Sequence, residues 1–213
     1  MLIGTSVLAL LGLTPASTDD VDALDAVTEV VPSVLGDATE LTIDQVVDTG
    51  QVEVLVSSDA TEGIELTAPG VDDFAIGLPF AENAQLVGSA DQPYFDNGNG
   101  SSTVPLVKDD GTVQILSIIE SANAPSSYSY EFDIPSDASL VLSSNGGAEV
   151  VTESGVIVGT VDAPWAVDAN GAAVPTHYLI AGDTLIQVVD FDSSTAFPVV
   201  ADPKFTVTWW NKT

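Results

Sequence analysis

The chain has 213 residues, 45 % of them apolar, so it can bury a substantial core and belongs with folded proteins. Its charge is one-sided, because 32 acidic residues face three lysines and no arginine, which leaves a net charge of −29. That charge argues against nucleic-acid and anionic-membrane partners. The absence of cysteine excludes disulfides, thiolate metal sites and cysteine nucleophiles.

Residues 1–17 resemble a signal peptide. Their apolar run is too short to span a bilayer as a mature helix. Pro15, Ala16 and Ser17 follow the run as a cleavage site would, although the basic residues that normally precede such a run are missing. We therefore expect an exported, secreted or cell-surface protein with no stable membrane span in its mature form. A buried N-terminal helix is the alternative.

Residues 18–48 are predicted to form an acidic helical leader or a linker. Helical spacing is seen in STDDVDALDAVTEVV (17–31), where Ser17 or Thr18 can cap the helix and Pro32 ends it. An unstructured acidic leader fits the same composition.

From about Thr49 the apolar period changes to two, which is typical of strands. Three short antiparallel strands are predicted, separated by the turn clusters SSDATEG and APGVDD. We expect one face of each strand to be formed by Val52, Val54 and Val56, by Ile64 and Leu66, and by Phe74, Ile76, Leu78 and Phe80.

Hairpins are expected to fill the chain as far as residue 203. One strand face carries Tyr128, Tyr130, Phe132 and Ile134, and turns are predicted at 109–111, 143–147, 153–155, 168–171 and 181–183. Strands spaced by roughly 8–12 residues indicate a mainly β fold, either an antiparallel β-sandwich or an open barrel. The β-rich domain is placed at 49–203, with a division into two subdomains near 122–127 left open, and a C-terminal tail at 204–213.

The sequence offers no constellation for nucleophilic or zinc chemistry. Its single histidine, His177, shares a predicted strand face with Leu179, where a structural role is expected, and no G-x-S-x-G elbow surrounds a serine. One histidine without cysteine leaves carboxylates for every other zinc ligand. Paired carboxylates can serve a glycosidase, but pairs carry little information among 32 acidic residues. We therefore predict no catalytic residue, cofactor or metal ligand, with a carboxylate-based hydrolase as the weakest alternative.

The loop at residues 96–101 is the one place where calcium is considered. DNGNGS offers oxygen ligands, but it lacks the full calcium-loop register and the later bidentate glutamate. A Gly/Asn-rich turn is the expected structure. Asp109, Asp110, Asp190 and Asp192 are likewise interpreted as turn and edge residues.

Three segments stand out in the second half of the chain, namely APWAVDANGAAVPTHY (163–178), GDTLIQVVDF (182–191) and FPVVADP (197–203). With them, roughly residues 75–203 resemble an uncharacterised domain of secreted actinobacterial proteins. The resemblance implies a signal peptide before the domain and a variable extension after it, and it implies no catalytic residues. The missing basic n-region and the short tail KFTVTWWNKT depart from that pattern.

These observations favour a non-catalytic β domain of the cell envelope or exterior, acting as a scaffold or leader for the segment that follows Pro203. The alternative is an extracellular binding module for a divalent cation or a cell-wall glycan, using the 96–101 loop or Trp165. The sequence identifies no specific partner.

Overall fold

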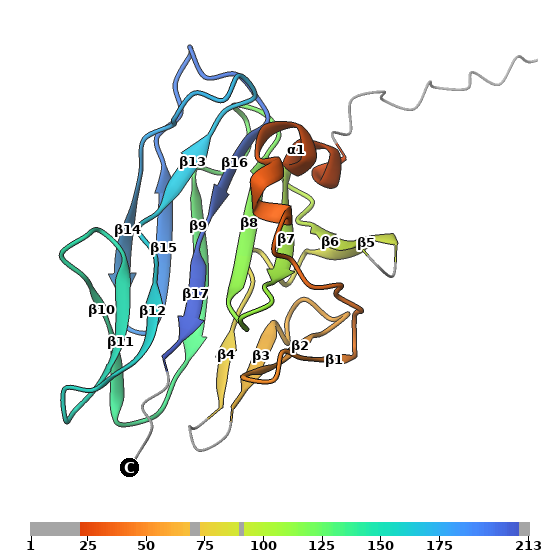
Figure 1. Cartoon of the computed structure of the whole chain (residues 1–213). Coiled ribbons are helices and arrows are strands. Elements are labelled where there is room, and N and C mark those ends of the chain that lie inside the picture. Colours follow the sequence, from red (N-terminus) through yellow and green to blue (C-terminus); the bar gives the residue numbers. More distant parts are fainter. Residues whose placement is uncertain (1–21, 69–72, 90–91, 209–213) are drawn as a thin grey trace, which may run out of the picture.

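The computed structural model describes residues 22–68, 73–89 and 92–208. Two antiparallel sheets pack face to face (Figure 1), which confirms the predicted mainly β sandwich. The signal-like residues 1–17 and the two C-terminal tryptophans, Trp209 and Trp210, lie outside the described residues. No described helix is long and apolar enough to cross a membrane.

The seven-stranded sheet has one face in the core and one in solvent. Buried and exposed residues alternate along its strands, most regularly in β9. Its strand order is β1-β2-β3-β4-β9-β15-β14. The strands are β1 (Val46–Asp48), β2 (Glu53–Val56), β3 (Ile64–Thr67), β4 (Phe74–Ile76), β9 (Ser127–Asp133), β15 (Thr184–Val189) and β14 (Thr176–Ala181).

The ten-stranded sheet forms the other layer. Its main path runs β10-β11-β12-β17-β8-β7-β6-β5, and β16 pairs with both β8 and β13. The strands are β5 (Gln85–Ser89), β6 (Gln92–Asp96), β7 (Ser101–Val107), β8 (Val113–Ile119), β10 (Ala138–Leu142), β11 (Ala148–Thr152), β12 (Ile157–Val161), β13 (Trp165–Val167), β16 (Val199–Asp202) and β17 (Lys204–Val207).

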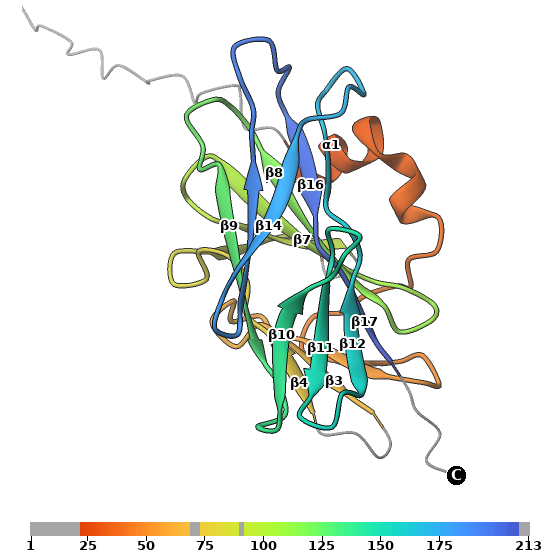
Figure 2. The ribbon, with the colours of Figure 1, turned by 90° about the vertical axis from the view of Figure 1, so that its left-hand side faces the viewer.

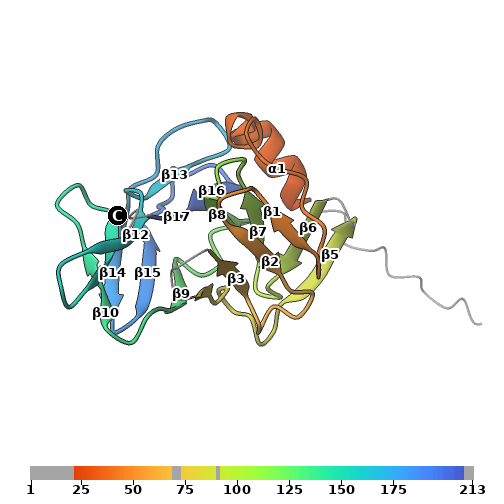
Figure 3. The same ribbon diagram turned by 60° about the horizontal axis from the view of Figure 1, so that its bottom comes forward.

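The two sheets meet along one side, where the edge strands β10 and β14 contact each other (Figure 2). On the opposite side, the β5–β6 hairpin extends away from the body of the sandwich (Figure 3). The layer between the sheets is filled mainly by aliphatic and aromatic side chains, among them Tyr128, Tyr130 and Phe95.

A short helix adds a third layer on the outer face of the ten-stranded sheet. Helix α1 (Ala23–Val30) is capped by Asp22, whose Oδ1 accepts a hydrogen bond from the Leu24 N–H at 3.0 Å. The predicted caps, Ser17 and Thr18, lie outside the described residues. The helix ends before Pro32 as predicted, and Pro32 begins a 3₁₀ helix, η1 (Pro32–Leu35).

Strand β8 is buried on both faces because the core lies on one side and α1 on the other. Val113 and Ile115 belong to the core between the sheets. Leu116 and Ile118 point the other way and pack with Ala23, Ala26 and Val27 of the helix.

The predicted strand faces are confirmed along residues 52–78. The apolar residues predicted for one face of each strand are buried, and Glu53 and Glu65 on the opposite face are exposed. Phe80 is only half-buried and has a positive φ of 56°, so the regular alternation ends before it.

The predicted hairpin turns are also present. The turn at 109–111 joins β7 to β8, and Gly111 there has a φ of 82°, which glycine adopts without steric cost. Turns likewise join β10 to β11, β11 to β12 and β14 to β15 at the predicted positions.

The sheet continues past Pro203, where the sequence places the start of a tail. Residues 204–207 form β17, which lies between β12 and β8. Phe205 is only 1 % exposed, with ring centroids 5.3 Å from Phe132 and 5.8 Å from Phe74. Both sheets also combine strands from before and after residues 122–127, where a division was left open.

Candidate functional site

The structure does not bring together the residues that the sequence singles out. His177 lies on the outer face of β14, and its Nδ1 is 3.5 Å from Oδ2 of Asp190. Both side chains are about half exposed (52 % and 56 %), so water screens this pair. Leu179 lies on the same face, as predicted, and is exposed.

The 96–101 loop forms a turn between β6 and β7 that is held by its own side chains. Asn97 is buried, and its Nδ2 donates to Ser101 Oγ at 3.0 Å and to Thr103 Oγ1 at 3.2 Å. Asp96 and Asn99 accept hydrogen bonds from the backbone N–H groups of Gly98 and Ser101. The oxygens considered for calcium are therefore engaged in forming the turn.

One member of each of the other two acidic pairs, Asp110 and Asp192, takes part in a turn in the same way. Asp110 accepts from the Thr112 N–H, and Asp192 accepts from the N–H and hydroxyl of Ser194. These hydrogen bonds lower the pKa of both carboxyls, chiefly through Thr112 and Ser194 respectively. Over residues 22–68, 73–89 and 92–208, no group of three or more histidines and carboxylates is placed to hold a metal ion.

The most unusual chemistry lies in the interior, around Asp202. This residue ends β16 and is 2 % exposed, yet it carries a carboxyl. Its Oδ2 accepts a hydrogen bond of 2.5 Å from Nε2 of Gln114, which is itself 4 % exposed on β8. From the opposite sheet, the Tyr178 hydroxyl donates to the Asp202 backbone carbonyl at 3.1 Å.

Trp165 covers this carboxyl. It lies in β13 directly across from Asp202, although Pro164 directly before it is typical of a turn. Interactions of the carboxyl with the backbone N–H and the indole side chain of Trp165 lower its pKa. The indole is half-buried, so it separates the carboxyl from solvent.

Burial raises the pKa of Asp202 to about 7, even though hydrogen bonds from Gln114 and Trp165 act in the opposite direction. The nearby Asp162 carboxyl raises it further through like-charge repulsion. Burial also raises the pKa of the Tyr130 and Tyr178 hydroxyls, so both stay neutral around Asp202.

Gln187 of β15 extends the polar cluster toward the seven-stranded sheet. Its Nε2 donates to the Trp165 carbonyl at 3.4 Å and to Thr176 Oγ1 at 3.2 Å. Its Oε1 is buried without a hydrogen-bond partner. The cluster thus holds one carboxyl of raised pKa and one unsatisfied acceptor.

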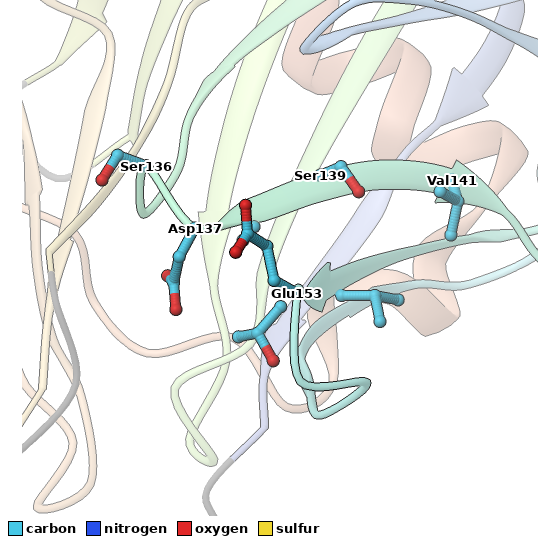
Figure 4. Close-up of a pocket in the computed structure, with 8 residues that line it drawn as sticks. Ser136, Asp137, Ser139, Val141 and Glu153 are labelled. Carbon is cyan, nitrogen blue, oxygen red and sulfur yellow. The ribbon is translucent and has the colours of Figure 1, made fainter.

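The surface carries shallow hollows. One of about 360 Å³ lies on the β10–β11 hairpin (Figure 4), where Asp137 and Glu153 lie beside each other and Ser139 and Val141 follow along β10. The backbone N–H of Glu153 donates to the Asp137 carbonyl at 2.7 Å, which closes the hairpin at this end.

A second hollow of about 590 Å³ lies on the outer face of the seven-stranded sheet. The half-buried Phe80 contributes an aromatic ring, and polar groups come from Thr61, Ser129, Glu131 and Thr184. The Phe80 ring packs edge-on against Tyr128 at 5.8 Å between centroids, which fixes its orientation.

A third hollow of about 700 Å³ lies on the surface between α1 and the strands β6 and β7. It is lined by aliphatic side chains and prolines, including Leu24, Leu35, Leu106, Pro93 and Pro105. Asp25 and Glu40 are the carboxylates in its lining.

No protein-family model, curated protein or solved structure matches this chain. The resemblance to a domain of secreted actinobacterial proteins therefore stays a prediction.

The sequence analysis did not identify the group of buried polar contacts formed by Asp202, Gln114, Trp165, Tyr178 and Gln187, which we call the Asp202 cluster. A signal was present, because Gln114, Gln187 and Asp202 each interrupt an apolar strand at a position whose apolar neighbours two residues away are buried. Polar residues at inward positions need buried partners, so they mark an interior network.

Proposed function

We propose that this chain is a non-catalytic domain of an exported or cell-surface protein, and that it serves as a rigid scaffold for its C-terminal segment. The position of β17 is the observation that carries the proposal. The strand is held by β12 on one side and by β8 on the other, and Phe205 anchors it in the core. A segment that follows Val207 is thereby attached to the middle of a sheet.

The signal-like N-terminus supports the extracellular setting, and the charge of −29 suits a soluble surface module. The described carboxylates other than Asp202 that have clear hydrogen-bond roles stabilise turns, cap α1, or connect separate segments, as Asp37 and Asp109 do. They therefore support the architecture, not a reaction.

Export is tested by expressing the full chain in a secreting bacterium and sequencing the N-terminus of the product. We expect a mature protein, cut near Ala16–Ser17, in the medium or cell envelope. A variant with Leu10→Asp and Leu11→Asp, which interrupts the apolar run, should stay uncut inside the cell. Uncut, protease-resistant wild-type protein found only in the cytoplasm would contradict the proposal.

The hollow beside Phe80 favours a second candidate, a glycan-binding module. An aromatic ring surrounded by hydroxyls suits a sugar, which presents apolar C–H groups and hydroxyls together. Calorimetric titration with cell-wall polysaccharide tests this candidate. Heat that disappears in Phe80→Ala would establish binding at this hollow, and absence of heat with the wild type would exclude it.

A further inference from the structure

The hollow on the outer face of the seven-stranded sheet opens where β4 leaves its neighbour β9. Their pairing ends at a hydrogen bond of 2.7 Å from the Gly77 N–H to the Glu131 carbonyl. The same register would place Pro79 opposite Ser129, but proline has no N–H to donate to a neighbouring strand. The chain turns away from β9 there, and most of its residues as far as Asn83 line the hollow together with Ser129 and Glu131.

The backbone N–H and C=O of Ser129 point into this gap. On its other side β9 pairs with β15, where the Phe132 N–H donates to the Asp183 carbonyl at 2.9 Å. Backbone groups alternate in direction along a strand, so Glu131 and Ser129 direct theirs away from β15 and toward the side of β4. No described strand pairs with Ser129 on that side. The hollow therefore offers one backbone donor and one backbone acceptor to a ligand or to water.

The side chains that line the hollow provide hydrogen-bond acceptors and negative charge. Glu82 and Glu131 are exposed carboxylates, and neither takes part in the ion pairs found among the described residues. Thr184 lies opposite Glu131 on β15, which places its hydroxyl on the same face of the sheet. The described residues of the lining include no lysine, arginine or histidine, so an anionic ligand would be repelled and a cationic one attracted.

Phe80 adds an aromatic surface to the same hollow. Its ring is held edge-on against Tyr128 and contributes to the lining. Aromatic rings attract ammonium groups as well as apolar C–H groups. The volume of about 590 Å³ is in the range of sites that bind small ligands.

We propose that this hollow binds a glycan that carries free amino groups. Glu82 and Glu131 pair with the ammonium groups, and the backbone edge of Ser129 binds sugar hydroxyls, which can both donate and accept. The Phe80 ring packs against the apolar side of a sugar ring. The proposal depends on the glycan-binding candidate given above and specifies the class of its ligand.

An added peptide strand fits this edge less well than a sugar. Peptides that extend a sheet rely on a run of main-chain hydrogen bonds. Asp133 and Glu131 already face β4 and Gly77, which leaves only Ser127 and Ser129 of β9 open to a new partner on this side. So short an edge suits a small polar ligand.

Calorimetric titration of the full chain with three trisaccharides tests the proposal. They are the β-1,4-linked trimers of glucosamine, N-acetylglucosamine and glucose, which differ only in the group at one carbon of each sugar. At about pH 6 the free amines are protonated and exposed carboxylates are ionised. We expect the glucosamine trimer to bind at least about five-fold more tightly than the other two, with an advantage that shrinks as sodium chloride is added.

Glu131→Gln should remove most of this preference, and it replaces an exposed side chain, so the fold should be retained. Glu53→Gln is the matched control. It removes the same charge from an exposed position on β2 of the same sheet, outside the lining of the hollow, and should leave the preference unchanged. An equal loss in the two variants would overturn the proposal, because it would show attraction to the net charge of −29 and not to the hollow.

The remaining outcomes separate this proposal from the candidate on which it depends. Equal affinity for all three trimers, lost in Phe80→Ala, would overturn the preference for amino groups and leave glycan binding intact. Absence of heat with every trimer would overturn both. Trilysine that binds more tightly than the glucosamine trimer and depends equally on Glu131 would overturn the proposal in favour of a basic peptide.

Discussion

At the residue scale, Lys108 is unusual because its side chain is buried, whereas lysine side chains normally lie at the surface. It is 3 % exposed, and its Nζ donates both to the Val34 carbonyl and to Oδ1 of Asp37. These contacts fasten the segment after α1 to the β7–β8 hairpin. Asp37 is largely exposed, so the carbonyl and the buried stem of the lysine account for most of the effect.

Replacing Lys108 by methionine is expected to lower the free energy of unfolding by about 1.5–3 kcal/mol. Methionine retains the apolar stem but leaves the Val34 carbonyl without its donor. Asp37→Asn removes the charge pair while retaining this hydrogen bond, and should cost less than about 1 kcal/mol. Urea unfolding measures both variants. An equal loss in the two would show that the ion pair, and not the buried carbonyl, dominates.

Single residues also show what the sequence can and cannot predict. The shared strand face of His177 and Leu179 follows from alternation along one strand and was correctly predicted, whereas the exposure of that face was not. The raised pKa of Asp202 was not predicted. It arises chiefly from burial, to which segments far from Asp202 in the chain contribute only in the folded protein, and from the nearby Asp162 carboxyl.

At the scale of elements, β17 shows how strongly the final strand belongs to the sheet. Phe205 packs against Phe74 and Phe132 of the opposite sheet. Gly159 of β12 lies under its ring, where an added Cβ would be 2.8 Å from Cε2 and Cζ. Strand β12 therefore has a glycine at the position where the Phe205 ring leaves no room for a side chain.

Phe205→Ala is expected to destabilise the protein by about 3–5 kcal/mol, because it leaves a cavity between the sheets. Ending the chain after Pro203 should prevent stable folding, since β8 and β12 both lose a partner strand. Leu179→Ala, at a position 49 % exposed on β14, is the control and should change stability by less than about 0.5 kcal/mol. Thermal unfolding and hydrogen exchange measure the stability of the two point variants and of the truncated chain. A folded truncation would show that the domain ends at Pro203.

Hairpins were predictable because their turns are local. The glycines at 111, 155 and 182 lie between strands that pair with their immediate neighbours. The order of the strands was not predictable, because β8 pairs with β16 and β17, and β9 pairs with β4 and β15. The same non-local pairing explains why β17 was assigned to a tail.

At the scale of the whole molecule, repulsion among carboxylates opposes folding. The net charge is −29, and the two described lysines, Lys108 and Lys204, are both within ion-pair distance of an aspartate. Screening by salt weakens repulsion between exposed charges more than it weakens the buried contacts of Lys108.

Raising sodium chloride from about 20 mM to about 500 mM should therefore stabilise the protein at pH 8 by roughly 1 kcal/mol, or about 2–4 °C in Tm. Scanning calorimetry measures the shift. Calcium chloride at matched ionic strength is the control, and a larger shift with calcium would support a cation site such as the 96–101 loop. A lower Tm in high salt would show that ion pairs outweigh repulsion.

The shared pairing of β8 has a consequence for the timing of folding. Its partners on one side, β16 and β17, are the last two strands among the described residues, whereas β8 itself lies about 80 residues earlier in the chain, at 113–119. The sandwich therefore cannot close until residues 199–207 have left the ribosome. Until then β8 keeps an open edge.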